Sequence, residues 1–107
     1  MPSRFPSYLL FPVLLVGCAS NHVVARSGDT VRLALLAPKA QTVLLVSSRN
    51  GFAPQPASLD ARGRWLASLP ATQGFSYFYL VDGKIYLPDC REREFDDFGG
   101  SNCLFQP

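Results

Sequence analysis

The stretch FSYFYLVDGKIY, residues 75–86, decides the fold of this chain. Its centre is Asp82-Gly83, which stands between two apolar runs. A two-residue hairpin turn needs positive φ at both central positions, and Asp-Gly is among the few dipeptides that supply it at low cost. We therefore predict that Phe75–Val81 pairs with Lys84–Leu87 as a β-hairpin.

The first arm of this hairpin has aromatic or aliphatic side chains at every position except Ser76, so both faces of the strand are largely apolar. Successive side chains of a strand point to opposite faces. Tyr77, Tyr79 and Val81 share one face, which we expect to point into the core. Phe78 and Leu80 share the other face, which is either buried under a further segment or exposed as an apolar contact patch.

Outward from the hairpin, glycine, proline and polar pairs interrupt the chain roughly every 8–12 residues, a rhythm typical of an all-β sandwich. No stretch keeps a helical period. The expected strands are Val23–Ala25, Thr30–Leu36, Thr42–Ser47, a hairpin arm entering at Leu59, Trp65–Leu69 and Asn102–Phe105. Ser48–Pro56 and Pro88–Gly99 are expected to be loops, and Trp65 is expected in the core because it lies within a strand that has an alternating pattern.

The N-terminus has the pattern of a secretory leader: Arg4, an apolar run over Tyr8–Val16, and small residues at the cut. The tetrapeptide Leu15-Val16-Gly17-Cys18 resembles the bacterial lipobox. That resemblance implies that residues 1–17 are removed and that Cys18 carries the lipid. The run is too short for a membrane-spanning helix, which needs ~20 apolar residues. A buried strand of a cytosolic protein is the alternative.

Ala19 and Ser20 follow the cysteine, with no Asp in second place. By resemblance to bacterial sorting rules, this places the protein at the outer membrane, held by its lipid anchor, with the domain facing the periplasm. We expect residues 18–29 to form the lipidated tether with a short leading strand, and residues 30–107 to form the sandwich. His22, the one histidine, is expected to be a solvated tether residue.

Cys90 and Cys103 remain once Cys18 is modified. An even pair in an oxidising compartment is most simply a disulfide. The alternative is a reactive or metal-binding pair, but the spacing does not fit a CxxC motif and no histidine is near. We therefore predict a disulfide that staples a small domain.

Composition excludes several functions. The net charge is +2, and no basic cluster of the kind that nucleic-acid partners require is present. Asp96 and Asp97 offer too few oxygen ligands to assign a cation site. No nucleophile–base pair, phosphate loop or metal cluster emerges. We therefore expect a non-catalytic protein without cofactors or metals.

Four segments together resemble a known family: LLAPKAQTVLLVSSRNGF, GRWLASLP, YFYLVDG and DDFGGSNCLF. Their order and spacing are similar to the isoamylase early-set domain, which is also the glycogen-binding domain (carbohydrate-binding module family 48) of AMP-activated protein kinase β subunits. The resemblance covers roughly Thr30 to Phe105. It implies an immunoglobulin-like, early-set β-sandwich.

In that family an α-glucan stacks on aromatic rings, and a Lys and an Asn bind its hydroxyls. Phe52 stands where the family has a loop Trp, Phe78 where it has the Lys, Ile85 where it has a second Trp, and Asn102 matches the Asn. The resemblance implies a partly degenerate site for an α-glucan or other glycan formed by Phe52, Phe78, Tyr86 and Asn102. The alternative is a protein-interaction module in a cell-envelope complex.

Overall fold

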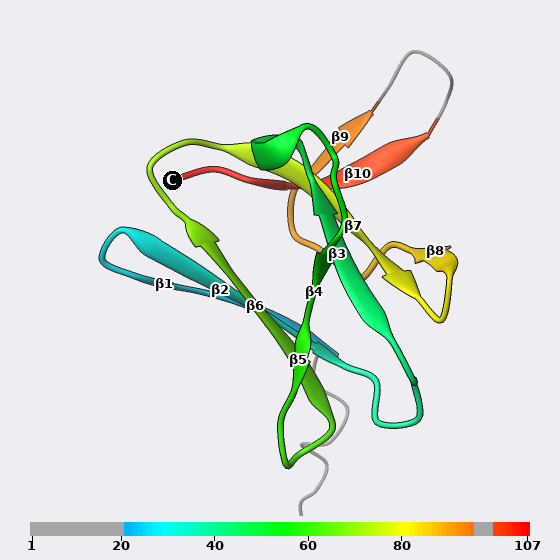
Figure 1. Cartoon of the computed structure of the whole chain (residues 1–107). Coiled ribbons are helices and arrows are strands. Elements are labelled where there is room, and N and C mark those ends of the chain that lie inside the picture. The colour runs from blue at the N-terminus through cyan, green and yellow to red at the C-terminus, as the bar shows by residue number, and fades with distance from the viewer. Residues whose placement is uncertain (1–20, 96–99) are drawn as a thin grey trace, which may run out of the picture.

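The computed structural model describes residues 21–95 and 100–107, which form two antiparallel sheets packed face to face (Figure 1). The strands are β1 (His22–Ser27), β2 (Thr30–Leu36), β3 (Val43–Ser47), β4 (Gln55–Pro56), β5 (Ser58–Leu59), β6 (Arg64–Pro70), β7 (Phe75–Val81), β8 (Lys84–Tyr86), β9 (Arg93–Phe95) and β10 (Ser101–Phe105). A short 3₁₀ helix, η2 (Ser48–Asn50), follows β3. The predicted all-β, immunoglobulin-like sandwich is confirmed.

The two sheets differ in size and in their central strand. The smaller sheet has the order β1-β2-β6-β5, and the larger has the order β4-β3-β7-β10-β9 with β8 also paired to β7. Strand β7 therefore pairs with β3 on one side, and with both β10 and β8 on the other. It is the central strand of the larger sheet, as its apolar character on both faces indicates.

The predicted hairpin is confirmed. Val81 pairs with Lys84, and the turn residues Asp82 and Gly83 have φ of 51° and 82°. The Asp82 side chain has a second role, because its Oδ1 accepts the backbone N–H groups of Gln41 and Thr42 at 2.8 and 2.9 Å. The hairpin turn is thereby tied to the β2–β3 loop.

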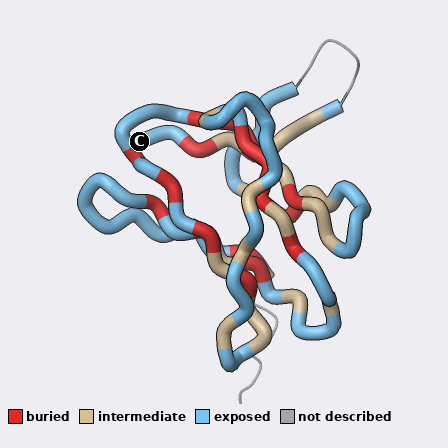
Figure 2. Tube along the Cα trace, in the orientation of Figure 1, coloured by how far each residue is buried: buried red, intermediate tan, exposed pale blue. Residues whose placement is uncertain are grey.

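The core lies between the facing sides of the two sheets, where Figure 2 shows the buried positions along both layers. Tyr77 and Tyr79 are 1% and 0% exposed on the inner face, as predicted. Trp65 is buried opposite them, and its indole Nε1 donates to the carbonyl of Ala37 at 2.9 Å. The rest of this core is Val31, Leu33, Leu35, Val43, Leu45, Ala67, Leu69, Ala71, Phe75, Cys103 and Phe105.

The expectation that His22 is a solvated tether residue is wrong. The leading strand is longer than Val23–Ala25 and starts at His22, which pairs with Leu35 and so shares its inner face. His22 is 7% exposed and shares a hydrogen bond of 2.8 Å with the Tyr79 hydroxyl. Among the described residues, the sheet thus begins ahead of the boundary expected at residue 30.

Two segments expected to be loops contain short edge strands. Arg93–Phe95 pairs with β10, and Gln55–Pro56 pairs with β3. All three residues of β9 are exposed. A strand that is solvated on both faces has no apolar alternation, so its pattern could not be distinguished from a charged loop. Pro56 is compatible with an edge strand because an outer edge does not need its N–H.

The predicted disulfide between Cys90 and Cys103 is confirmed. Cys103 is fully buried in β10, whereas Cys90 lies in the segment between β8 and β9. The bond fixes that segment against the core, and the two cysteines are 13 residues apart in sequence.

We expect that replacing both cysteines, Cys90→Ser with Cys103→Ala, lowers the free energy of unfolding by about 3 kcal/mol, because the unfolded chain regains the entropy of the closed loop. Urea unfolding of the oxidised protein and of the variant measures the difference. Adding a reductant should lower the midpoint of the parent protein and leave that of the variant unchanged. Equal midpoints for the two oxidised proteins would contradict this account.

A second prediction concerns two glycines with positive φ, Gly63 at 80° and Gly28 at 62°. A Cβ at Gly63 would lie 2.7 Å from the Cβ of Pro38, whereas a Cβ at Gly28 would meet nothing within 4 Å. Gly28→Ala should cost about 1 kcal/mol for the left-handed backbone alone. Gly63→Ala should cost at least about 2 kcal/mol, because the contact with Pro38 adds to this strain. Chemical denaturation compares them, and equal losses would refute the steric part.

Candidate functional site

The first candidate site is the outer face of the larger sheet, centred on Phe78. Phe78 pairs with Val46 of β3, so the two side chains share this face. Leu80, two residues on, pairs with Leu44 on one side and with Ile85 on the other. These pairs give the face an apolar side that continues to Pro56, the partner of Leu44.

The other side of this face is polar. Cys103 pairs with Tyr77, so the preceding residue, Asn102, follows the register to a place beside Phe78 on the outer face. Asn102 in turn pairs with Glu94 of β9, which is exposed. The Phe78 ring therefore lies between aliphatic side chains and a polar margin formed by an amide and a carboxylate.

The outer face is partly covered rather than fully open. Phe78, Leu80 and Asn102 are half-buried, and Val46 is only 4% exposed. Ile85, at the end of the apolar row, is 76% exposed. The face thus falls between the two alternatives that the sequence left open, a buried face and an open apolar patch.

Phe52 lies at the loop that leaves the far end of β3. Its backbone N–H donates to the carbonyl of Ser47 at 2.8 Å, and its side chain is 47% exposed. Its φ is 67°, and the preceding Gly51 has a φ of 69°. The left-handed region is unfavourable for a bulky side chain, so the loop holds this ring in a strained backbone.

Tyr86 does not lie on the same face as Phe78. It pairs with Tyr79 across the hairpin, so its side chain shares the inner face, where it packs at the margin of the core. Its hydroxyl accepts a hydrogen bond of 2.6 Å from Nδ2 of Asn21. Of the four residues expected to form a glycan site, the structure brings Phe78 and Asn102 together, places Phe52 beyond the end of β3, and separates Tyr86.

The second candidate site is a cleft of about 650 Å³ between β1 and the disulfide-bonded segment. Its lining is His22, Val24, Tyr77, Asp89, Cys90, Arg91, Glu92, Leu104, Phe105 and Gln106. Val24 shares the face of Leu33 but is 41% exposed, and it lines this open cleft. Sequence reasoning missed this cleft, since it arises only where β1 and the stapled segment meet.

The inner part of the cleft is uncharged at neutral pH. Burial lowers the pKa of His22 to about 4 and raises the pKa of Tyr77 to about 12. The pKa of Tyr79 is raised too, by burial and then by the proximity of Tyr77. Asp89, Arg91 and Glu92, which are all exposed, supply charges on the outer side of the cleft.

Several expectations fall on other parts of the chain. Cys18, with the leader over residues 1–17, and the acidic pair Asp96 and Asp97 lie outside the described residues. Within 21–95 and 100–107, no group of three or more His, Cys, Asp or Glu side chains is placed to hold a metal ion. Over the same ranges, no helix has the length and apolar character needed to cross a bilayer.

Comparison with known proteins adds no family. No family model matches the chain, and no significant match was found among curated proteins.

The lowered pKa of His22 predicts a specific loss of stability in mild acid. The folded state keeps His22 neutral down to about pH 4, whereas in the unfolded chain the imidazole has its ordinary pKa of 6.5 and binds a proton below it. Between these values the unfolded state binds more protons, so stability falls as the pH falls. The expected loss from this group is about 3 kcal/mol between pH 7 and pH 4.

His22→Gln is the matched control, because its side chain keeps a polar group at this position but does not titrate. The difference in unfolding free energy between the parent and this variant should shrink as the pH falls, since carboxylate titrations are common to both. Urea unfolding at several pH values and an NMR titration of the imidazole measure the effect. Parallel stability curves, or a His22 pKa above 6, would contradict it.

Proposed function

We propose that this protein is a non-catalytic, lipid-anchored envelope protein whose sandwich binds an α-glucan or a related glycan on the outer face of the larger sheet. The observation that carries the proposal is the position of Phe78 on this face, with Asn102 on one side of it and aliphatic side chains on the other. The resemblance of four ordered segments to the glycogen-binding early-set domain supports the same ligand class.

The chemistry of this face suits a sugar. The C–H face of a pyranose packs on a flat aromatic ring, while its hydroxyls need a small number of oriented polar groups. Phe78 offers the ring, Asn102 offers both a donor and an acceptor, and Glu94 adds an acceptor one strand further. A half-buried ring also binds with little loss of side-chain entropy, because its neighbours already hold it.

The strained backbone at Phe52 also supports a binding role. A left-handed residue with a large side chain costs on the order of 1 kcal/mol relative to glycine, which is the common choice there. An aromatic ring that is 47% exposed recovers little of this cost by burial. Contact with a ligand explains why a ring is kept under these conditions, and the loop Trp makes such a contact in the family that this chain resembles.

The proposed location rests on Cys18 and on the disulfide. A lipid on Cys18 anchors the protein to the outer membrane with the domain in the periplasm. The Cys90–Cys103 bond suits this oxidising compartment.

A second candidate function uses the apolar row on the same face. Leu44, Leu80 and Ile85 lie next to one another across three strands, and Ile85 is 76% exposed. Aliphatic rows of this kind favour a protein partner over a sugar. This is the protein-interaction module in an envelope complex that the sequence left as the alternative.

The test is a calorimetric titration of the protein with maltoheptaose and, separately, with peptidoglycan fragments. Phe78→Ala and Asn102→Ala should each weaken binding about tenfold, as expected for the loss of a stacking or hydrogen-bonding contact of about 1.4 kcal/mol. Phe52→Gly should weaken binding while leaving the unfolding free energy unchanged or raised, because it removes the backbone strain.

Phe95→Ala is the matched control, since Phe95 is 73% exposed but, as the neighbour of Glu94 in β9, points to the opposite face of the sheet. Its affinity should equal that of the parent. Ile85→Arg separates the two functions, because it should leave glycan binding intact and abolish capture of a protein partner from native membranes. Absence of heat with every glycan would refute the proposed ligand class.

A further inference from the structure

One end of the sandwich surrounds the point where the chain enters β1, and we call it the entry end. The carbonyl of Asn21 accepts the N–H of Leu36 at 2.8 Å, and the N–H of Ala37 donates to Gly63 at 3.1 Å. The β2–β3 loop is held to the β7–β8 turn by Asp82, as described above. The entry end therefore consists of Asn21, the loops 36–42 and 59–64, and the turn 82–85, and Figure 1 shows both loops at the same end of the molecule as the start of β1.

Basic side chains gather at this end. Lys39, Arg62 and Lys84 are exposed, and the Arg64 side chain is 41% exposed. Two carboxylates, those of Asp60 and Asp82, are the acidic groups among the described residues of this end. The entry end thus has an excess of positive charge.

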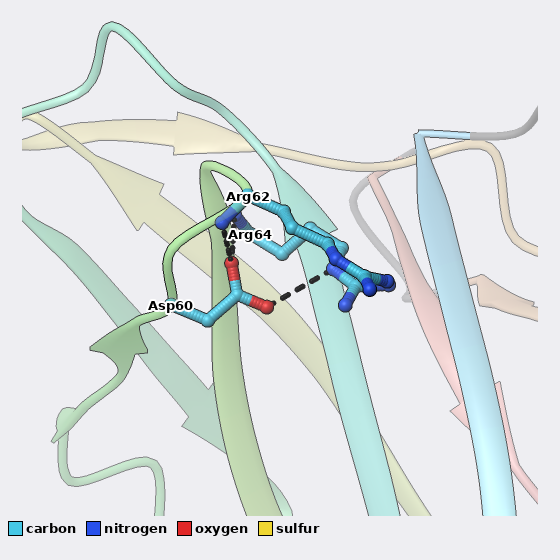
Figure 3. Close-up of polar contacts among 3 residues, drawn as sticks. All are labelled: Asp60, Arg62 and Arg64. Carbon is cyan, nitrogen blue, oxygen red and sulfur yellow. Dashed lines mark hydrogen bonds and ion pairs between the residues drawn. The ribbon is translucent and has the colours of Figure 1, made fainter.

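Both carboxylates are occupied by contacts within the protein. Asp60 Oδ1 accepts the backbone N–H groups of Arg62 and Arg64 at 2.8 and 3.0 Å, and its Oδ2 pairs with Arg64 Nε at 3.1 Å. Figure 3 shows the two arginine side chains extending away from this loop in the same direction. Because Asp60 and Asp82 shape their turns, they leave Lys39, Arg62 and Lys84 to face outward.

Exposed apolar side chains lie within three residues of these charges in the sequence. Leu36 is 46% exposed, Leu59 is 52% exposed and Ile85 is 76% exposed. Each is adjacent to, or part of, a loop or turn of the entry end. Basic residues mixed with exposed aliphatic residues are typical of protein surfaces that lie in the headgroup region of a bilayer.

The short segment between Cys18 and β1 keeps the entry end close to a membrane if Cys18 carries the proposed lipid anchor. Cys18 and His22 are separated by four peptide units. A fully extended chain of this length spans at most about 14 Å. A lipid on Cys18 therefore keeps the start of β1, and with it the entry end, within reach of the headgroups.

We propose that the entry end docks on an anionic phospholipid surface. Lys39, Arg62 and Lys84 contact phosphates, and Leu36, Leu59 and Ile85 enter the interface. The opposite end, which carries Phe52 and the β6–β7 turn, points away from the bilayer. The outer face with Phe78 then stands upright and open to a ligand that approaches along the membrane.

The experiment uses the processed, lipidated chain in nanodiscs of phosphatidylethanolamine and phosphatidylglycerol with a paramagnetic label on the headgroups. Broadening of backbone amide signals should be strongest at residues 36–42, 59–64 and 82–85, and weakest at residues 48–52 and 71–74. Uniform broadening, or a maximum at any other surface, overturns the proposal. An equal difference in broadening between the two ends in nanodiscs of phosphatidylcholine also overturns the proposal, because docking would then not depend on an anionic lipid.

The variant Lys39→Glu/Arg62→Glu/Lys84→Glu should reduce the contrast between the two ends by at least about fivefold, the loss expected for even one basic side chain at an anionic surface. The matched control, Arg26→Glu/Arg49→Glu/Arg91→Glu, makes the same change of charge away from the entry end and should keep the contrast. Amide chemical shifts away from the substituted sites verify that both variants are folded.

Mass spectrometry of the protein used in this experiment tests the lipid anchor separately from the docking surface. A diacylglyceryl group on Cys18 together with uniform broadening overturns the docking surface and leaves the anchor. An unmodified Cys18 in an unprocessed chain overturns both. Glycan titrations are independent of either result, because they probe the outer face.

Discussion

The structure depends on one strand that is packed on both of its faces. The inner face of β7 places Tyr77 and Tyr79 in the core, where Tyr79 also bonds the imidazole of His22. The outer face places Phe78 and Leu80 among side chains of β3, β8 and β10. Because the side-chain period of a strand is two, no slip of register is tolerated: a shift by one residue would turn the tyrosines outward and Phe78 inward.

The hairpin could be predicted from the sequence because its signal is local. Asp82 and Gly83 specify the turn, and β2 and β7 have the predicted bounds because their apolar alternation is strong. Strand β9 and the full length of β1 could not be predicted in this way. Both are edge strands with mainly exposed side chains, so they lack the alternation of apolar and polar residues by which a strand is recognised in a sequence.

The candidate site was partly predictable, and its error has a simple cause. A two-residue turn that pairs Val81 with Lys84 also pairs Tyr79 with Tyr86. Once Tyr79 is assigned to the inner face, Tyr86 has to share it, so counting residues across the hairpin was enough to separate Tyr86 from Phe78. The position of Asn102 beside Phe78 needs the β7–β10 register, which no local pattern contains. The cleft near His22 likewise depends on tertiary structure, because it forms where β1 lies beside the disulfide-bonded segment around Cys90.

Three separate constraints thus shape three surfaces of this small domain. Alternation in β7 determines the outer face, and the disulfide determines the cleft by holding the segment around Cys90 against β10. The entry end is determined by turn chemistry, in which Asp60 and Asp82 bind backbone N–H groups. Each carboxylate accepts hydrogen bonds from backbone N–H groups of its own end, and the basic side chains of Lys39, Arg62 and Lys84 remain exposed at the surface. The charge that faces outward at the entry end is therefore a consequence of how its turns are built, and it lies apart from the uncharged, half-buried ring of Phe78 on the outer face.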